Sequence, residues 1–543
     1  AALARPDAAL APSVTAPVLA RPRPAGARGV ARGGVAGIAG SAVAGGCGVA
    51  VTWVVARALG AEQAGAFFAA TAAFVLGGGL AKLGTQTGLV YWPARLRATG
   101  RGQLLGACLR TALTPVLLLS VTLAVAMWLG APAIARITAA GSPHVLGEHA
   151  AGLRMLALFM PLQAMTDALL TGTRGYRAMR PTVLYDRVLR SVLQLVLVGA
   201  AGIATVWTTV RGPKPGLAVG GAGSLPLFAF AWAAPYLPVT VLAALSLRTI
   251  YRVNRPAGPR TRRVERRRLS RDFWRFTGPR ALASVAQLAL QRVDVLLVAA
   301  LGGLAPAAVY AVAGRFVVLI QFANQGISQS VQPRLAEALA TGDRATANRL
   351  YRTATGWLVL VSWPIILLVS QFAPLYLGVF GGGYRSGAPV VVVLAGAMLV
   401  ATGCGMVDMV LAMAGRTSWN LVNVLIALGV TVGLDVLLIP RLGALGAAIG
   451  LACAMVANNL LPLVQVGRVA RLHPFGAGTC SAALLAVGCF GVLPRIVTAL
   501  AGSGVAGLGI TAGLALPSYA GGAWLLRRPL ALAAFKIRRK RTV

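Results

Sequence analysis

Fourteen long apolar segments constrain the fold of this chain more than any other feature of its sequence. A helix needs about 20 predominantly apolar residues to cross the hydrocarbon layer of a membrane, and only 12% of the 543 residues are charged. The segments lie at residues 34–56, 64–90, 108–131, 150–172, 182–206, 224–250, 276–302, 307–332, 353–379, 389–413, 418–439, 444–467, 477–499 and 503–526. The sequence therefore predicts an all-α polytopic membrane protein with about 14 transmembrane helices.

The positions of the basic residues indicate how these helices are oriented. Of the 51 lysines and arginines, 40 fall in the two tails and the even-numbered connections, and 8 fall in the odd-numbered connections. Because basic connections remain in the cytoplasm, both termini are predicted to be cytoplasmic. The densest basic run, 255–275, is interpreted as a loop held near anionic membrane lipids. Aromatic side chains do not alternate with its arginines, so no nucleic-acid partner is expected.

The chain also contains an internal repeat. LGAEQAGAFFAATAAF at 59–74 aligns without gaps with LGGLAPAAVYAVAGRF at 301–316, an offset of 242 residues. Six segments separate the two copies, so both halves have the same orientation and form parallel six-helix lobes, with helices 13 and 14 appended. The predicted parts are a disordered basic N-terminal tail (1–33), an N-lobe of helices 1–6 (34–250), a basic cytoplasmic linker (251–275), a C-lobe of helices 7–12 (276–467), and helices 13–14 with a basic C-terminal tail (468–543).

Several stretches carry a family resemblance. They are ARALGAEQAGAFFAATAAF in the first half, and VDVLLVAALGGLAPAAVYAVAGRF followed by QPRLAEAL and GD in the second half. The sequence resembles the polysaccharide-exporter branch of the multidrug/oligosaccharidyl-lipid/polysaccharide (MOP) flippase superfamily, which includes Wzx-type flippases. The resemblance implies two lobes around a cavity that opens alternately to each side of a bacterial plasma (inner) membrane. It also implies a polyprenyl-diphosphate-linked oligosaccharide as cargo, with a glycan polymerase or other assembly proteins as candidate partners.

Polar residues recur at helical spacing inside several apolar segments. In segment 276–302 a stripe of one helix face runs from Arg280 to Asp294 at spacings of four and three. Lipid rejects such stripes, so they are predicted to line a wet cavity between the lobes; hydrogen bonds between packed helices are the alternative. Arginines in this cavity suit a diphosphate. The predicted substrate-cavity residues are Lys82, Gln86, Arg280, Gln287, Gln291, Arg292, Arg315, Gln321 and Gln325.

Three aspartates inside segments are candidates for coupling transport to H⁺ or Na⁺, namely Asp294, Asp435 and Asp408. Helix rise places Asp294 at the depth of Arg292 and Arg315, Asp435 somewhat further out, and Asp408 well towards the cytoplasm. A permanent salt bridge and a carboxylate that switches between a cation and an arginine both explain the cluster, with Arg315 as the first expected partner of Asp294. The resemblance implies a cation-site role for Asp294 on helix 7 and, by segment alone, for Asp408 on helix 10.

The remaining motifs exclude other chemistry. No phosphate-binding G-x-x-x-x-G-K-[ST] loop is present, so the chain itself does not couple ATP hydrolysis to transport. The six cysteines form no Cys-x-x-Cys pair, and neither a metal nor a cofactor is expected. Together with these absences, the resemblance implies a non-enzymatic flippase of a lipid-linked oligosaccharide. The alternatives are a MATE-like cation-coupled exporter of amphipathic molecules, a non-transporting membrane scaffold and a membrane glycosyltransferase.

Overall fold

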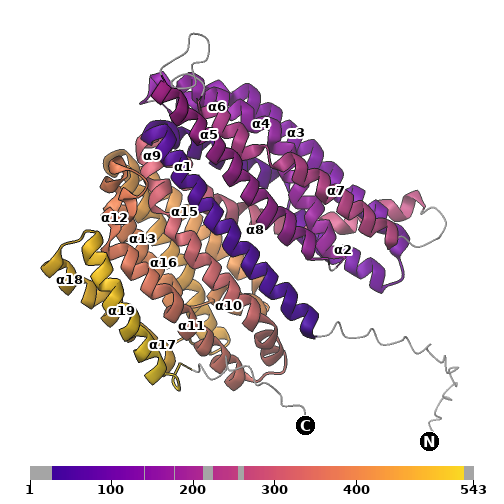
Figure 1. Ribbon diagram of the computed structural model, residues 1–543. Helices are drawn as coiled ribbons and strands as arrows, with labels where there is room; N and C mark the ends of the chain where they lie inside the picture. Colours follow the sequence, from indigo (N-terminus) through magenta and orange to yellow (C-terminus); the bar gives the residue numbers. More distant parts are fainter. Residues whose placement is uncertain (1–26, 140, 177, 212–223, 255–261, 531–543) are drawn as a thin grey trace, which may run out of the picture.

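The computed structural model describes residues 27–139, 141–176, 178–211, 224–254 and 262–530, and across these ranges the chain is helical without strands (Figure 1). The first half contains α1 (Ala27–Ala81), α2 (Thr85–Ala98), α3 (Leu105–Thr138), α4 (Leu146–Gly175), the π-helix η3 (Thr182–Arg190), α5 (Ser191–Arg211), α6 (Ser224–Ala233) and α7 (Tyr236–Val253). The second half contains α8 (Arg263–Leu301), α9 (Leu304–Ala313), α10 (Arg315–Ala340), α11 (Arg344–Gln371), α12 (Ala373–Gly378), α13 (Ala388–Gly403), α14 (Val407–Met413), α15 (Thr417–Leu442) and α16 (Ala444–Val469). The chain continues with α17 (Ala477–Ala486), the π-helix η5 (Val487–Val492), α18 (Leu493–Ala501) and α19 (Val505–Leu525).

The predicted all-α membrane fold is confirmed. Twelve helical stretches within the described ranges are long and apolar enough to cross a membrane. The first, Ala39–Ala98, contains two predicted segments because the chain turns at Gly60 inside α1. The fourteenth predicted segment corresponds to α19, which is 21 residues long but is not among those twelve. Fourteen segments were predicted and twelve stretches are found, because two predicted segments share one stretch and because α19 does not reach the required mean hydropathy.

Glycines with positive φ form the tight turns between paired helices at one end of the molecule. Gly60 (φ 73°, ψ 179°), Gly303 (φ 95°, ψ 172°) and Gly502 (φ 78°, ψ 168°) share a conformation that residues with a Cβ rarely adopt. Gly60 and Gly303 occupy corresponding turns of the two halves. They are 243 residues apart, whereas the offset of the gapless alignment is 242. The repeat therefore carries a one-residue shift at this turn.

The two lobes are joined close to these glycine turns. The indole N–H of Trp53 and the ε N–H of Arg57 both donate to the carbonyl oxygen of Val379, at 3.0 Å each. A Cβ at Gly65 would lie 1.9 Å from the carbonyl oxygen of Leu304, so α1 and α9 pack in direct backbone contact. We call the end that carries Gly60 and Gly303 the closed face, because these contacts hold the lobes together there.

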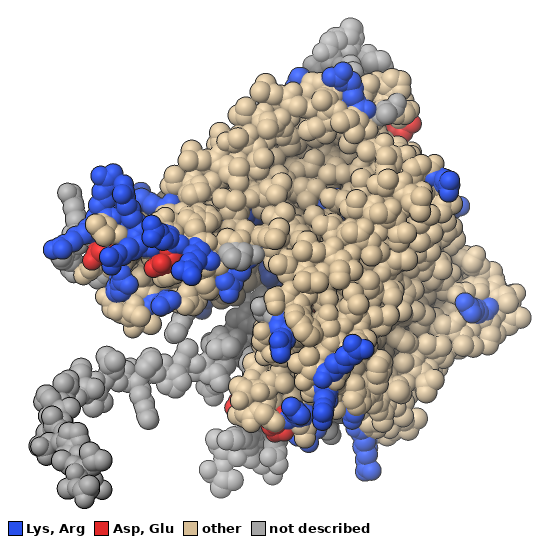
Figure 2. All heavy atoms as spheres, turned by 180° about the vertical axis from the view of Figure 1, so that it is seen from behind, with Lys and Arg blue, Asp and Glu red and all other residues tan. Residues whose placement is uncertain are grey.

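The other end carries most of the charge and is called the basic face, defined by Arg97, Arg271 and Arg349. Figure 2 shows two groups of lysine and arginine side chains on either side of a notch in the surface. Helices α2, α4 and α7 of the first half form no substantial contact with α10, α11 or α14 of the second half within the described ranges. The lobes are therefore separated at the basic face and joined at the closed face.

Helix α8 bridges the two lobes. Its first turns bury Leu269 and Phe273 in an apolar cluster of the first half, whereas Ala286 and Leu290 pack with Val424 of α15. Residues 263–275, which fall in the predicted linker, are thus the first turns of this helix. A movement of one lobe against the other must therefore bend, tilt or unpack α8.

The contact at Gly65 generates the first prediction. Gly65→Ala forces α9 away from α1 and should lower the unfolding temperature, with a cost of about 1–3 kcal/mol for overpacking. Gly48→Ala is the matched control, since Gly48 lies on the same helix with open space around its Cβ position, and alanine favours helix by about 1 kcal/mol. Thermal unfolding followed by tryptophan fluorescence measures both. Equal unfolding temperatures for the two variants would contradict the close approach.

Candidate functional site

Asp294 is a buried carboxylate at the junction of α8 and α9. Its side chain is only 5% exposed, and one carboxylate oxygen accepts a hydrogen bond from the hydroxyl of Tyr310 on α9. The other oxygen accepts from the backbone N–H of Val295 at 2.8 Å. The turn at Gly303 brings Tyr310 back alongside α8, which is how two consecutive helices supply both partners.

Asp435 on α15 lies near Asp294 and is fully buried. Neither of its carboxylate oxygens has a hydrogen-bond partner within the described residues, and the hydroxyl of Thr431, one turn earlier, is equally unpartnered. Helix α16 packs so closely that a Cβ at Gly450 would lie 2.2 Å from Oδ1 of Asp435. Asp294 is close enough to act on Asp435 electrostatically. Asp435, buried from water with both oxygens unpartnered and with a second carboxylate nearby, forms an arrangement suited to a proton or a small cation.

Arg292 and Arg315 form a second cluster where the lobes meet. Both side chains are partly buried, and the ε N–H of each is buried without an acceptor in the described part of the chain. The Arg315 guanidinium lies 5.6 Å from the ring centroid of Phe68, which belongs to α1 of the first half. The two guanidinium groups also repel each other electrostatically. Their free N–H groups and shared charge therefore favour an anionic ligand between the lobes.

The expected pairing of Arg315 with Asp294 is wrong. The hydroxyl of Tyr310 bonds Asp294, and no ion pair joins Asp294 to an arginine within the ranges that the structure describes. Tyr310 was missed because it reads as an apolar core residue in VYAVAG. Its position sixteen residues after Asp294, across a glycine turn, is the signal that would have found it.

The other predicted cavity residues are distributed along the helix surfaces. Arg280 stacks on Phe276 of its own helix at 4.0 Å and donates to the Phe276 carbonyl oxygen at 2.8 Å. Lys82 is partly buried and forms an ion pair with Asp167 of α4. The exposed members of the predicted set are Gln86, Arg280, Gln287, Gln291, Gln321 and Gln325.

Asp408 is not brought to the carboxylate pair. It is an exposed residue of α14, and its backbone carbonyl accepts from the side-chain amide of Asn420 at 3.0 Å. Asp294 acts electrostatically on Asp435, Arg292 acts on Asp294, and Asp408 acts on neither aspartate. The candidate coupling site thus contains two of the three predicted aspartates.

The first lobe contains an ionic network that sequence reasoning missed. In η3, Arg190 donates to Asp186 at 2.8 Å and to Gln194 at 3.1 Å. Arg187, on the same π-helix, donates to Ser41 of α1. Both arginines lie inside the predicted segment 182–206, and the four-residue spacing of Asp186 and Arg190 in YDRVLR is the signal of a helical ion pair. A π-helix is rare and frequently marks a functional site.

The Lys82–Asp167 pair can be tested by a double-mutant cycle. Lys82→Met leaves a partly buried carboxylate without its cation and should lower the unfolding free energy by about 1–3 kcal/mol. Adding Asp167→Asn should restore much of that loss, because neither charge then lacks a partner. Thermal unfolding of both single variants and the double variant gives the coupling energy. Additive losses would show that the two side chains act independently.

Comparisons with known proteins address the fold. Residues 279–438 match the family model described as MatE, and no curated protein matches the chain. The lipid II flippase MurJ in an inward closed conformation superposes with a TM-score of 0.67 at 12% identity, over 91% of this chain and 98% of that chain. An inward-facing multidrug resistance MATE family transporter gives 0.61 at 15% identity, over 78% and 95%.

A MOP superfamily transporter from Pyrococcus furiosus gives a TM-score of 0.53 at 18% identity, over 81% of this chain and 95% of that one. These three solved structures share the two-lobe fold described above. The chain is therefore a multi-pass membrane protein with the fold of the MOP superfamily of transporters, and its residues 279–438 match the MatE family.

Proposed function

We propose that this protein is a plasma-membrane flippase that moves a polyprenyl-diphosphate-linked oligosaccharide from the inner to the outer leaflet by alternating access. The observation that carries this proposal is the pair Arg292 and Arg315, whose buried N–H groups lack acceptors where the two lobes meet. A diphosphate supplies hydrogen-bond acceptors for both guanidinium groups at once. Such charge-assisted hydrogen bonds are stronger than hydrogen bonds between neutral groups. Both termini lie in the cytoplasm in this scheme, so the basic face is the cytoplasmic entrance.

The separation of the lobes at the basic face supports entry from the inner leaflet. Contacts at Gly65, Trp53 and Arg57 close the other end, so in this scheme a lipid-linked group approaches Arg315 from the side of the notch. Export then requires these closed-face contacts to part while the basic face closes. Helix α8, which packs on both lobes, transmits that movement past the arginines.

The carboxylates of Asp294 and Asp435 supply a route for coupling to H⁺ or Na⁺. A proton or cation bound there reduces the repulsion between the two carboxylates and changes the bond to Tyr310. Asp294 lies two residues from Arg292 on the bridging helix, so occupancy of the site acts on the segment that holds the cargo. Binding can bias the lobes in this way only if the cation has different affinities for the two arrangements.

The match of residues 279–438 to MatE favours a second candidate, a MATE-like exporter of amphipathic cations. The two candidates differ in the charge that the cavity attracts. The arginine pair favours an anionic cargo, whereas an exporter of cations needs its carboxylates accessible from the cavity. In this fold Asp435 is fully buried and Asp294 nearly so, which supports the flippase.

The cargo is tested in proteoliposomes that contain a fluorescent polyprenyl-diphosphate oligosaccharide, with flipping measured by quenching in the outer leaflet. Arg292→Gln and Arg315→Gln should each slow flipping about tenfold or more, as expected for one lost charge-assisted contact. Arg334→Gln is the matched control, because Arg334 is an exposed arginine of α10 outside the predicted cavity set. Transport of an amphipathic cation, with no movement of the diphosphate lipid, would establish the MATE-like alternative.

Coupling is tested in the same vesicles with imposed proton or sodium gradients. Asp294→Asn and Asp435→Asn should abolish the dependence of the flipping rate on the gradient, because a neutral amide cannot exchange a cation. Asp408→Asn is the control, since this exposed residue stands apart from the pair. Unchanged gradient dependence in both site variants would remove the two aspartates from coupling and leave the cargo assignment intact.

A further inference from the structure

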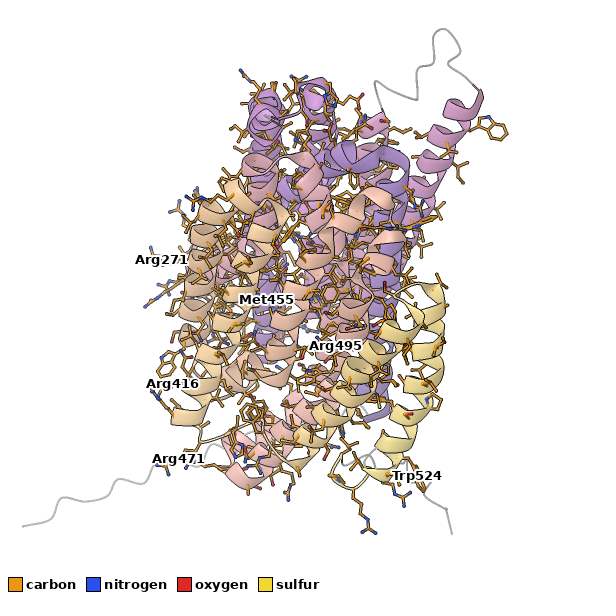
Figure 3. The ribbon with its side chains drawn as sticks, turned by 90° about the vertical axis from the view of Figure 1, so that its left-hand side faces the viewer. Arg271, Arg416, Met455, Arg471, Arg495 and Trp524 are labelled. Carbon is orange, nitrogen blue, oxygen red and sulfur yellow. The ribbon has the colours of Figure 1, made fainter. Side chains whose placement is uncertain are left out.

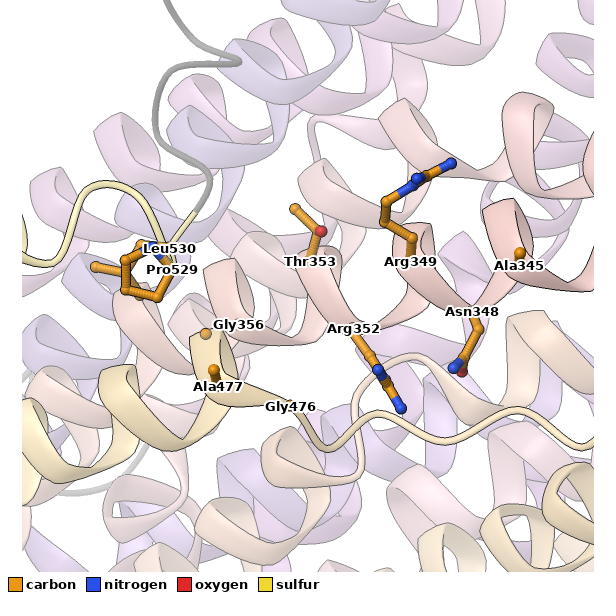
Figure 4. Close-up of a pocket in the computed structure, with 11 residues that line it drawn as sticks. Ala345, Asn348, Arg349, Arg352, Thr353, Gly356, Gly476, Ala477, Pro529 and Leu530 are labelled. Carbon is orange, nitrogen blue, oxygen red and sulfur yellow. The ribbon is translucent and has the colours of Figure 1, made fainter.

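A cavity of about 330 Å³ lies at the basic face, away from the interface between the lobes (Figure 4). Three segments that are distant in sequence enclose it: the first turns of α11, the start of α17, and the chain just after α19. The α11 residues lie at spacings of three and four, so they form one helix face. They are Ala345, Asn348, Arg349, Arg352, Thr353 and Gly356.

Glycines allow these three segments to approach one another. A Cβ at Gly478 would lie 2.5 Å from the carbonyl oxygen of Pro529, and one at Gly476 would lie 3.3 Å from Cδ of Arg352. A Cβ at Gly356 would lie 3.5 Å from the backbone of Gly478 and Thr479. The indole N–H of Trp357 also donates to the carbonyl oxygen of Leu530 at 3.0 Å. The cavity walls are therefore fixed by specific contacts.

The polar lining of the cavity is cationic. The ε N–H of Arg352 is buried without an acceptor in the described structure, while an Nη of the same guanidinium contacts the ring of His473. Arg349 adds a second guanidinium, which donates to Thr346 at 2.9 Å. No acidic side chain lines the cavity within the described residues. The lining thus presents positive charge that no carboxylate neutralises.

Asp343, an acid that feels the charge of Arg349, is already engaged. Its carboxylate caps α11 by accepting the backbone N–H of Thr346 at 2.9 Å, and that hydrogen bond holds its pKa below the ordinary value.

The start of α17 adds further hydrogen-bond donors to the cavity, because Gly476 caps this helix in an extended conformation with no side-chain hydrogen bond. The backbone at Ala477 and Gly478 lines the cavity, and free N–H groups at a helix start favour anions.

We propose that this cavity binds the phosphate of an anionic phospholipid headgroup. A planar guanidinium with a free N–H and an uncapped helix start both match phosphate oxygens. The position fits a membrane interface, since exposed Phe475 adjoins the cavity and exposed Trp524, stacked with Arg527, lies at the same end as Arg471 (Figure 3). The bound headgroup ties α17–α19 to α11 of the second lobe. This site is independent of the cargo and of the carboxylate pair.

The experiment uses the full-length protein in nanodiscs of phosphatidylcholine, with or without phosphatidylglycerol. Phosphatidylglycerol should raise the unfolding temperature of the wild type, and native mass spectrometry should detect retained phosphatidylglycerol. Arg352→Gln and Arg349→Gln should each weaken this retention about tenfold, as expected for one charge-assisted contact. Arg334→Gln is the matched control, because Arg334 is an exposed arginine of α10 that does not line the cavity.

The outcomes distinguish the source of the phosphate. Equal retention of phosphatidylglycerol by Arg352→Gln, Arg349→Gln and Arg334→Gln would overturn the proposal. Protection of lipid-free protein by inorganic phosphate as strong as that by phosphatidylglycerol would assign the cavity to a free anion and overturn the lipid assignment. Equal unfolding temperatures of all variants in phosphatidylcholine alone show that the substitutions leave the fold intact. Partial retention by Arg352→Lys, which keeps the charge but loses the fork, would support bidentate binding.

Discussion

The interior of a membrane supplies no water, so every buried charge depends on the polar groups that the fold brings to it. The two lobes meet this constraint in different ways. In the first lobe the charges are paired, Lys82 with Asp167 and Arg190 with Asp186. In the second lobe Asp435 has no hydrogen-bond partner among the described residues. Asp167 and Asp186 of the first lobe thus have cationic partners, whereas Asp435 of the second lobe is left for a ligand or an ion to satisfy.

Helix α8 gives this asymmetry a mechanical consequence. It begins among apolar residues of the first lobe, and near its other end Asp294 accepts from the hydroxyl of Tyr310 in the second lobe. Its polar stripe therefore runs along a helix that is packed into both lobes over much of its length. A change in the charge of Asp294 acts on one end of α8, and a change in the separation of the lobes acts on its other end. Coupling through a packed helix requires no separate pathway of side chains.

The helical architecture was predictable because its signals are long and repeated. Twenty-residue apolar segments, the distribution of arginines and the offset of 242 residues each extend over much of the chain. The candidate site was predictable only in part. Asp294 and Asp435 were predicted because the sequence alone shows that each lies inside an apolar segment. Their partners come from other helices, and helix rise gives depth without giving rotation, which is why Arg315 was assigned to Asp294 in place of Tyr310.

The repeat explains why the carboxylate site belongs to one lobe alone. In the gapless alignment Tyr310 corresponds to Phe68, and with the one-residue shift at the glycine turn it corresponds to Phe67. In either register the first lobe has a phenyl ring where the second has a phenol. The phenol hydroxyl donates to Asp294, whereas the ring face of Phe68 receives the Arg315 guanidinium. The halves also differ at the acid itself, because the counterpart of Asp294 is Thr52 in the gapless alignment and Val51 with the shift. The second lobe therefore holds both a carboxylate and the phenol that bonds it, while the first lobe at that level offers an aromatic surface to a cation.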